Sequence, residues 1–501
     1  MAVLNSFQVI VIAAFVVTVQ SFSHSHFGGD AISLRHHIPT VLYNDHNKHD
    51  QLIYGMGGEN LCKRWSELVS EGEVTATTML HDDSGDDGKG LRVKYGVRLE
   101  KENNSAQRLL EFVEILSDEQ DFKTKDHITS INTTLTEMQQ LASNDRLAIQ
   151  CIYDGPYAAQ LQLIRTLRPP RSKDMSSSTN KDEKVSCQPP PYDSSKDSFL
   201  VGPLRLFGHG EFHGDGEPRA RAARLWIPSD DANRIAAWDA YHNISPVDPR
   251  GHYLLLPKID DKREWRDQSL SLSDCYDVTY LAYSIVPAGS MILSFNSVGA
   301  GASQNHIHCH AWICPPPPFL GRTGTAENMS GYAVTKASAT SSLTLAHGVH
   351  VSLLDYPCTC IKLSASVATD KRQTPTSPIL KEMGNALSSV VKVAQDMQVP
   401  HNVAWTNSQL KSRSDDNDES QSKKNLINLE LYVFFRRAET SSLMDGDIFR
   451  LGASEMLGVF HSSSNAQLQF LSNNKMMNNI LADVSLPREF VWAEVCKTLE
   501  K

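Results

Sequence analysis

The chain has 501 residues, 40% of them hydrophobic and 21% charged, with a formal net charge of −10 and a pI near 6.0. This is the composition of a globular protein with a sizeable core, and the length indicates two or three domain-sized units. The acidic balance and the lack of a basic stretch argue against a nucleic-acid partner, but they leave room for a basic pocket that holds a small phosphate ester. The nine cysteines are scattered and odd in number, so no disulfide framework is expected.

The N-terminus resembles a targeting segment. Val9–Val17 is an unbroken apolar run that is followed by Val19-Gln20-Ser21. We predict a signal-like segment over residues 1–27, secretory or plastid in type, with a buried N-terminal segment as the alternative. The apolar run is too short to span a bilayer and no later segment is apolar enough, so no membrane partner is expected.

The first folded region is expected over residues 28–168. Within it, Cys62–Leu68 has the pattern of an amphipathic helix, and Leu91–Leu99 alternates like a strand. Residues 169–198 change to Ser, Lys, Asp and Pro, a composition that cannot bury enough apolar surface to order itself. We predict a disordered linker there.

The second folded region begins near Phe199. Tyr241–Pro246 and His252–Pro257 are predicted to be two strands joined by a Pro/Gly turn. A helix is expected over Ser271–Val286, with Asp274 in its first turn after a serine cap.

A strand is predicted at Ser290–Phe295, another at Leu426–Arg437, and a closing helix at Ser485–Lys497. Strands, helix and strands in this order indicate an α+β protein. We assign residues 199–320 to a catalytic region and 321–501 to a C-terminal region, which carries a low-complexity insertion at 411–424.

The residues that carry chemistry lie between Leu293 and Pro318. His306, His308 and His310 alternate with apolar residues, which indicates a strand with all three imidazoles on one face. A neutral imidazole on a rigid strand is a competent nucleophile toward phosphorus, since one nitrogen attacks while the other keeps its proton. His308 is the central residue, and the flanking histidines would orient or neutralise the phosphate.

Three alternatives compete with this interpretation. Three imidazoles can hold zinc, but the outer two would be about 13 Å apart along a strand, which is awkward for one tetrahedral ion. We therefore expect no metal. The histidines could also be satisfied core or surface residues, and the loop Gly299–Ser303 could be only a tight turn.

The motif His306–Trp312 resembles the histidine-triad pattern. Preceded by Asn296, Gly299 and Ser303, it is similar to the galactose-1-phosphate uridylyltransferase and dinucleoside-tetraphosphate phosphorylase branch of that superfamily. The sequences NSVGAGASQNHIHCH and NISPVDPRGHYLLLP resemble more closely the GDP-hexose phosphorylases, which act on GDP-D-glucose or GDP-L-galactose. The turn after Pro246 is one residue longer than their pattern.

The resemblance implies two half-barrel-like antiparallel sheet units with helices around one active site. It implies phosphorolysis of a GDP-hexose to hexose 1-phosphate and GDP through a guanylyl-His308 intermediate. His306 and His310 would flank the nucleophile, and Asn296, Gly299, Ser303 and Asn305 would contact the substrate phosphate or the nucleophile.

Inorganic phosphate would be the co-substrate, with no cofactor, and the partner would be a nucleotide sugar bound by a possible homodimer. The resemblance implies a cytoplasmic protein, whereas the N-terminal segment allows secretory or plastid targeting, so the compartment stays open. His310 also occurs in hydrolases, so the alternatives are a dinucleoside polyphosphate phosphorylase or a nucleotide hydrolase and, outside enzymes, a nucleotide-binding module without turnover. Glu455 and His401-Asn402 are further candidates for the pocket, although a structural role is favoured for both.

Overall fold

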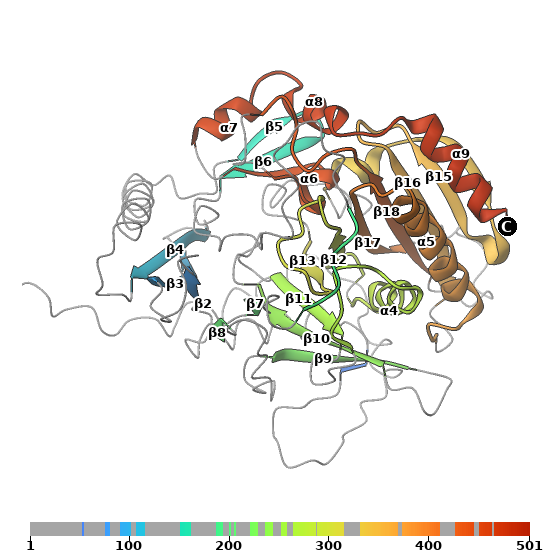
Figure 1. Ribbon diagram of the computed structural model, residues 1–501, viewed down its shortest axis with the longest axis horizontal. Coiled ribbons are helices and arrows are strands. Elements are labelled where there is room, and N and C mark those ends of the chain that lie inside the picture. The colour runs from blue at the N-terminus through green and yellow to red at the C-terminus, as the bar shows by residue number, and fades with distance from the viewer. Residues whose placement is uncertain are drawn as a thin grey trace, which may run out of the picture.

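The computed structural model describes residues 53–54, 76–80, 91–101, 107–115, 151–161, 187–193, 200–201, 205–206, 221–228, 236–243, 252–257, 264–286, 288–314, 331–368, 373–410, 426–444, 450–462 and 465–500. Helices accompany predominantly antiparallel sheets in this part of the chain, so the predicted α+β class is confirmed (Figure 1). None of the described helices is long and apolar enough to cross a membrane.

One large sheet dominates the described residues and has eleven strands in the order β1-β9-β10-β11-β13-β12-β17-β18-β16-β15-β14. Its first half consists of β9 (Arg221–Ile227), β10 (Ala236–His242), β11 (His252–Pro257), β12 (Met291–Asn296) and β13 (Cys309–Ile313). Its second half consists of β14 (Ala339–Thr344), β15 (His350–Leu354), β16 (Cys360–Ala368), β17 (His401–Leu410) and β18 (Leu426–Phe435).

The two halves repeat one topology. In each, the third strand leads through a helix to the fourth, and the fifth strand inserts between the third and the fourth. The helices are α4 (Leu272–Tyr283) in the first half and α5 (Pro378–Asp396) in the second. The fourth strands β12 and β17 pair antiparallel and form the seam between the halves. The halves are therefore continuous in one sheet, and their expected half-barrel shape stays a prediction.

Smaller elements surround the large sheet. β1 (Ile53–Tyr54) adds to its edge. One three-stranded sheet consists of β5 (Cys151–Asp154), β6 (Tyr157–Leu161) and β19 (Val459–Ser462), and another of β2 (Ala76–Leu80), β3 (Leu91–Lys101) and β4 (Gln107–Ile115). β7 (Leu200–Val201) and β8 (Arg205–Leu206) form a two-stranded sheet. The remaining helices are η7 (Ala333–Lys336), η8 (Ala346–Gly348), α6 (Ala453–Leu457), α7 (Asn465–Leu471), α8 (Met476–Asp483) and α9 (Arg488–Leu499).

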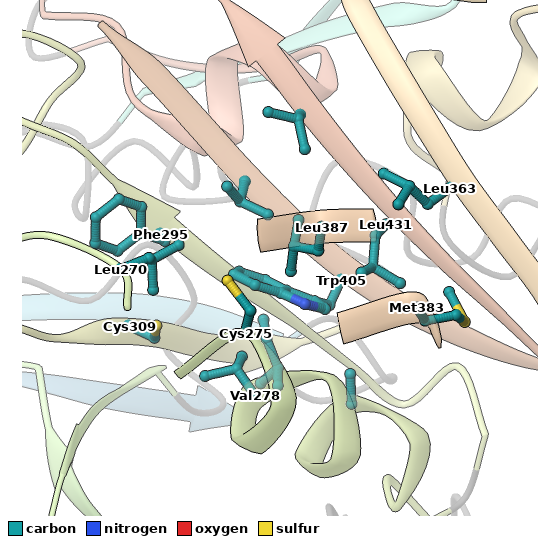
Figure 2. Packing of buried hydrophobic residues seen from close by; sticks show 14 of the residues in the cluster. Leu270, Cys275, Val278, Phe295, Cys309, Leu363, Met383, Leu387, Trp405 and Leu431 are labelled. Carbon is teal, nitrogen blue, oxygen red and sulfur yellow. The ribbon is translucent and has the colours of Figure 1, made fainter. Parts of the chain in front are cut away.

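Alternation along the seam strands divides their side chains between two cores. Leu293 and Phe295 of β12 and Trp405 of β17 belong to one large apolar cluster with residues of α4 and α5. Figure 2 shows Phe295 and Trp405 in this cluster. Gly384 of α5 lies directly against the ring of Tyr276 of α4, a close helix approach that a Cβ atom would block. Because this cluster contains residues of both halves, the halves share one core.

A second apolar cluster covers part of the opposite sheet face. It joins Trp312 of β13 and Tyr432 of β18 to residues of η7, α6, α7, α8 and β19. Trp312 Nε1 donates a hydrogen bond of 2.6 Å to the Tyr332 hydroxyl. The segment that contains α6 is thereby brought against the seam, where the candidate site lies.

Several predicted elements are confirmed with small shifts of their ends. Ser271 caps α4, and its side chain and that of Asp274 form a capping box, but the helix ends at Tyr283, before the predicted end. The closing helix begins at Arg488, because Pro487 is its cap residue instead of lying in the first turn. The predicted strands Ser290–Phe295 and Leu426–Arg437 correspond to β12 and β18.

Of the two strands predicted before the helix, His252–Pro257 is confirmed as β11, whereas Tyr241–Pro246 is confirmed only at its start, because β10 ends at His242 and residues 244–246 lie outside the described residues. β10 and β11 pair antiparallel. The alternating stretch Leu91–Leu99 lies in β3. The segment 1–27, the predicted helix Cys62–Leu68 and the insertion 411–424 lie outside the described residues. The assigned domain boundaries stay predictions.

Candidate active site

The three predicted histidines lie in series, and a fourth continues the row. The ring centroids are 4.9 Å apart for His306 and His308, 5.1 Å for His308 and His310, and 5.2 Å for His310 and His252. Regular pairing begins only at Cys309, so the prediction that all three histidines lie on a strand is wrong for His306 and His308. They lie in the segment that leads into β13. Their rings nevertheless stay adjacent.

The hydrogen bond of the His308 ring defines its tautomer. Its Nδ1 lies 2.8 Å from the backbone carbonyl oxygen of His306, which can only accept a hydrogen bond. Nδ1 therefore carries the proton, and Nε2 keeps its lone pair. Burial lowers the pKa of His308 to about 4, so the ring is neutral at pH 7. Burial, with His308 as the next cause, also holds the pKa of His306 well below its usual range.

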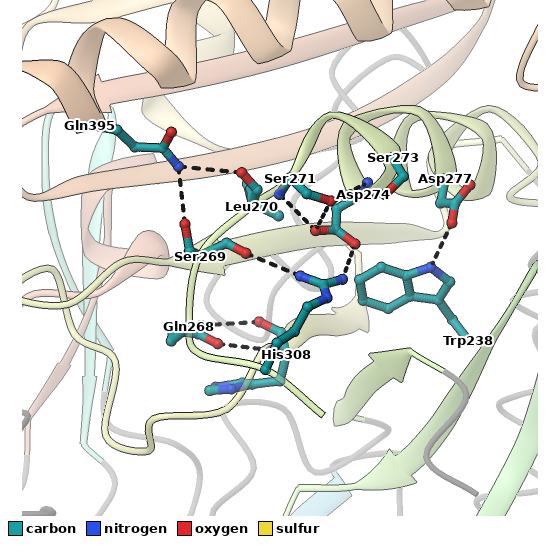
Figure 3. A network of polar contacts seen from close by, with 11 residues as sticks. Trp238, Gln268, Ser269, Leu270, Ser271, Ser273, Asp274, Asp277, His308 and Gln395 are labelled. Carbon is teal, nitrogen blue, oxygen red and sulfur yellow. Dashed lines mark hydrogen bonds and ion pairs between the residues drawn. The ribbon is translucent and has the colours of Figure 1, made fainter. Parts of the chain in front are cut away.

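Gln268 holds the backbone of the candidate nucleophile (Figure 3). Its Oε1 accepts from the His308 amide at 2.9 Å, and its Nε2 donates to the carbonyl oxygens of Asn296 and His308 at 2.9 and 3.2 Å. The side chain thus joins the end of β12 to the segment before β13. Its loop is anchored in turn by the ion pair between Arg266 and Asp274. Nothing in the sequence pattern singled out Gln268, since it belongs to no motif.

His252 and Asn243 extend the site on the side of His310. His252 Nε2 lies 3.1 Å from His310 Nδ1, and the Asn243 amide nitrogen lies 3.1 Å from His252 Nε2 and 3.4 Å from His310 Nδ1. The register of β11 and β13 brings these side chains together, with His252 opposite Trp312 and Leu254 opposite His310. The sequence offered His252 only as part of the GHYLLLP stretch, so its place beside the triad was missed.

The predicted phosphate loop is built around two glycines with positive φ, Gly299 (+72°) and Gly301 (+103°). A Cβ on Gly301 would lie 3.0 Å from both Gly452 Cα and the Leu451 carbonyl oxygen. The loop is therefore packed against the segment before α6, where only glycine fits. Ser303 at the end of this loop is exposed.

Asn305 points toward backbone atoms. Its Oδ1 lies 3.4 Å from the Gln268 amide and its Nδ2 donates to the Pro190 carbonyl at 3.0 Å. Pro190 lies in residues 187–193, the described part of the stretch predicted as a linker. Cys187 in the same part is buried, and its sulfur would be 3.5 Å from a Cβ on Gly299. This piece of the predicted linker is in contact with the site.

Asn296 lies at the seam and contacts two other segments. Its Oδ1 accepts from the Asn402 amide nitrogen at 2.8 Å and from the Ala453 backbone N–H at 3.0 Å. Asn402 is thus part of the site, whereas the neighbouring His401 occupies the other face, beside Phe295.

Glu455 stabilises the local fold. Its two oxygens contact the Gly452 amide at 2.8 Å and His461 Nδ1 at 2.9 Å, and both side chains are buried. The glutamate therefore caps α6 and pairs with β19. Among the described residues, no three His, Cys, Asp or Glu side chains gather closely enough to hold a metal ion.

No protein-family model matches the chain, and none of the curated proteins matches it. Among solved structures, yeast Ap4A phosphorylase Apa2 in complex with AMP is 13% identical, with a TM-score of 0.36 over 72% of this chain and 97% of that chain. The same enzyme in complex with Ap4A is 14% identical, with a TM-score of 0.37 over 68% of this chain and 89% of that chain. The chain is thus similar to these structures at a low level.

Proposed function

We propose that the chain is a nucleotidyltransferase that works through a covalent nucleotidyl-His308 intermediate. The observation that carries the proposal is the 2.8 Å contact between His308 Nδ1 and the His306 carbonyl, which leaves Nε2 as a neutral nucleophile. Two imidazoles flank it, at 4.9 and 5.1 Å between ring centroids. These two imidazoles can position a phosphate and interact with its negative charge.

In the first step, Nε2 attacks the α-phosphorus of a nucleoside diphosphate ester. A P–N bond forms, the P–O bond to the distal phosphate breaks, and that phosphate leaves as a phosphomonoester. The phosphorylated ring is cationic, because Nδ1 keeps its proton. The His306 carbonyl stabilises this charge by accepting the hydrogen bond from Nδ1.

In the second step, an oxygen of inorganic phosphate attacks the same phosphorus. The P–N bond breaks, a nucleoside diphosphate forms, and Nε2 regains its lone pair. Replacing phosphate by water would give a nucleoside monophosphate, which is the hydrolytic alternative.

The substrate we propose is a GDP-hexose, with hexose 1-phosphate as the leaving group. The resemblance of NSVGAGASQNHIHCH and NISPVDPRGHYLLLP to the GDP-hexose phosphorylases supports this choice. A dinucleoside polyphosphate is the second candidate. It is supported by the loop Ala300–Ser303, which resembles that of adenylyl-transferring relatives, and by the identical chemistry at the α-phosphorus.

The experiment is a phosphate-dependent turnover panel of GDP-glucose, GDP-L-galactose, GDP-mannose, UDP-glucose and diadenosine tetraphosphate, with His308→Ala as the control. We expect GDP release from a GDP-hexose that requires phosphate and disappears in the variant. Turnover of diadenosine tetraphosphate alone would replace the GDP-hexose by the second candidate. Nucleoside monophosphate released without phosphate would indicate a hydrolase, and no turnover of any compound would overturn the proposal.

A further inference from the structure

A row of buried polar side chains crosses the seam from the second half of the sheet to the first. Arg436, directly after β18, and Asn402 on β17 are both 0% exposed, and Asn296 at the end of β12 is 9% exposed. A guanidinium enclosed this completely needs a partner for each donor and a reason to be retained. Asn296, the last residue of this row, lies beside the segment that contains His308, since Gln268 Nε2 donates to the carbonyl oxygens of both residues.

Arg436 directs its donors to four acceptors. Nη1 donates to Asn402 Oδ1 at 3.1 Å and to the Leu451 carbonyl at 2.8 Å, while Nη2 and Nε donate to the carbonyls of Glu439 and Ala438 at 2.6 and 3.1 Å. A guanidinium has no acceptor. The amide of Asn402 therefore has to present its oxygen to Arg436.

This orientation sets the direction of the next amide. Asn402 Nδ2 donates to the Ala300 carbonyl at 2.7 Å and to Asn296 Oδ1 at 2.8 Å. The Ala453 backbone N–H, which can only donate, reaches the same Oδ1 at 3.0 Å. The Asn296 amide thus has a single orientation, with its oxygen bound twice. No acceptor among the described residues forms a hydrogen bond with its Nδ2.

Alternation along β12 places the Asn296 side chain on the sheet face of the histidines. β12 and β13 pair Ser294 with His310, and opposite residues of an antiparallel pair have their side chains on the same face. Asn296, two residues after Ser294, has its side chain on this face too, and the His310 ring is 5.1 Å from that of His308. Gln268 Nε2, which donates to the carbonyl oxygens of Asn296 and His308 at 2.9 and 3.2 Å, keeps the two segments together beyond the last backbone pair.

We infer that Arg436 and Asn402 are positioning residues that orient the Asn296 amide so that its two N–H bonds face the phosphoryl group attacked by His308. The inference rests on the proposed function and deepens it. Asn296 is the residue that touches the substrate, and the second half of the sheet supplies the two that orient it. A fixed donor that meets growing negative charge without reorganising stabilises a transition state more than the ground state.

Asn402→Asp is the variant that tests this directly. The aspartate can still accept from Arg436, but it sets an oxygen instead of an N–H against Asn296 Oδ1, so the two oxygens repel and the Asn296 amide is displaced from the orientation that only the Ala453 N–H still supports. Loss of one oriented donor lowers chemical rates about 10²- to 10³-fold in enzymes. We expect the rate of nucleotidyl-His308 formation in a single turnover to fall by about 100-fold, with KM changing less than about threefold.

Asn407→Asp is the matched control on the same strand. Asn407 also accepts one hydrogen bond, from the Gly289 amide at 2.8 Å, and donates two, to the carbonyls of Tyr283 and Ile285 at 3.2 and 3.1 Å. It lies away from the histidines, so the same substitution should lower thermal stability and leave the labelling rate of the folded protein unchanged. An equal loss of rate in both variants would reduce Asn402 to a structural residue and overturn the inference.

A double-mutant cycle with Asn296→Ala shows whether Asn402 acts through Asn296. We expect Asn402→Asp to change the labelling rate less than about threefold once Asn296 is alanine, although each single variant is slowed by about 100-fold. If the losses of labelling rate in the two single variants instead multiply in the double variant, the inference is overturned. Arg436→Lys, which keeps the charge but loses the fork of donors, should show the same dependence on Asn296.

A binding experiment separates failure of the inference from failure of the proposed function. The wild type should bind GMP more tightly than guanosine, and Asn402→Asp should remove most of that difference by calorimetry. If the wild type forms no nucleotidyl-histidine, the proposed function fails, and the difference between GMP and guanosine binding in the two proteins alone decides the inference. If the wild type labels normally and Asn402→Asp labels equally fast, the inference fails and the proposed function stands.

Discussion

The two halves of the large sheet share one topology but differ in chemistry. The fifth strand of the first half is led in by His306 and His308 and contains His310, while that of the second half carries Asn428, Glu430 and Tyr432 at the same two-residue spacing. Both triplets have apolar residues between them that point toward α4 and α5. They therefore lie on corresponding faces of corresponding strands.

The polar groups of the second triplet are bound by one another and by Lys362. Glu430 contacts Lys362 Nζ at 2.5 Å and accepts hydrogen bonds from the Tyr432 hydroxyl at 2.7 Å and from Asn428 Nδ2 at 3.1 Å. In the first half, burial instead keeps His308 neutral and its Nδ1 bond leaves Nε2 available. The two halves have the same topology but not the same site, because reactivity depends on which side-chain groups are left able to react.

The largest difference between the halves should appear when each triplet loses one group. His308→Ala removes the nucleophile, and we expect phosphate-dependent turnover to fall by at least about 10³-fold. Tyr432→Phe removes only a hydroxyl bound to Glu430, so turnover should stay within about twofold. Steady-state assays of both variants check this. Comparable losses would place catalytic groups in both halves.

The shared core predicts that the halves unfold together. Trp405 of the second half is completely buried, and its Nε1 donates to Thr279 Oγ1 of α4 at 3.3 Å. Trp405→Ala should lower the free energy of unfolding by about 3–5 kcal/mol. Phe490→Ala, at a residue that is 54% exposed, should change it by less than about 0.5 kcal/mol. Urea unfolding should show one transition, and two separate transitions would mean independent halves.

Acid should destabilise the seam from both sides. Burial lowers the pKa of His308 in the first half and of His401 in the second to about 4, from an ordinary value near 6.5. Between these values the unfolded chain binds protons that the folded chain does not, so stability falls as the pH drops from about 6.5 to about 4. Each histidine contributes about 3 kcal/mol to that loss.

Urea unfolding of the wild type and His401→Gln as a function of pH measures this effect. Glutamine does not titrate, so the variant should lose less stability than the wild type over the same interval. A profile that is flat from pH 6.5 to 4 would show that folding does not lower the pKa of these two rings.

The smallest effect concerns two glycines with positive φ, one in each half. Gly301→Ala brings a Cβ within 3.0 Å of Gly452 and Leu451, whereas a Cβ at Gly348, also with positive φ (+75°), meets nothing within 4 Å. Both variants should lose about 1 kcal/mol from backbone strain. Only Gly301→Ala should also slow turnover, by about tenfold, because the loop must move. Equal turnover in both would show that the loop position is unimportant.

Much of the local structure could be predicted, because it depends on neighbours along the chain. The serine cap and Asp274 predicted the start of α4, an alternating pattern predicted β3, and the strands β12 and β18 were also predicted. The ends were less certain, since contacts with other elements decide where a helix stops. The strand expected through all three histidines was cut short because Gln268, about 40 residues earlier, takes the place of a partner strand at His308.

The candidate site was predicted only where it is contiguous. His306, His308, His310 and Asn296 stand close together in the sequence, so a motif could identify them. Gln268 and Arg436 come from other segments and belong to no pattern that spacing reveals, whereas Asn243 and His252 stand in the stretch NISPVDPRGHYLLLP, which did not show that they lie beside the triad. Asn402 was considered and assigned a structural role, since a single asparagine at the start of a strand carries no signal of its partners.

The sequence by itself determined the α+β class, some of the strands and helices (β3, β11, β12, β18, α4 and α9), and the histidine series with its small-residue loop. These follow from periodicity, caps and glycine conformations, which act over a few residues. The tertiary structure alone decided that the halves join at β12 and β17, that His308 is buried and neutral, and that Arg436 and Asn402 reach Asn296. Those features depend on register and burial, which bring together groups far apart in the chain, such as the Ala453 backbone N–H and the Asn296 side chain, 157 positions apart.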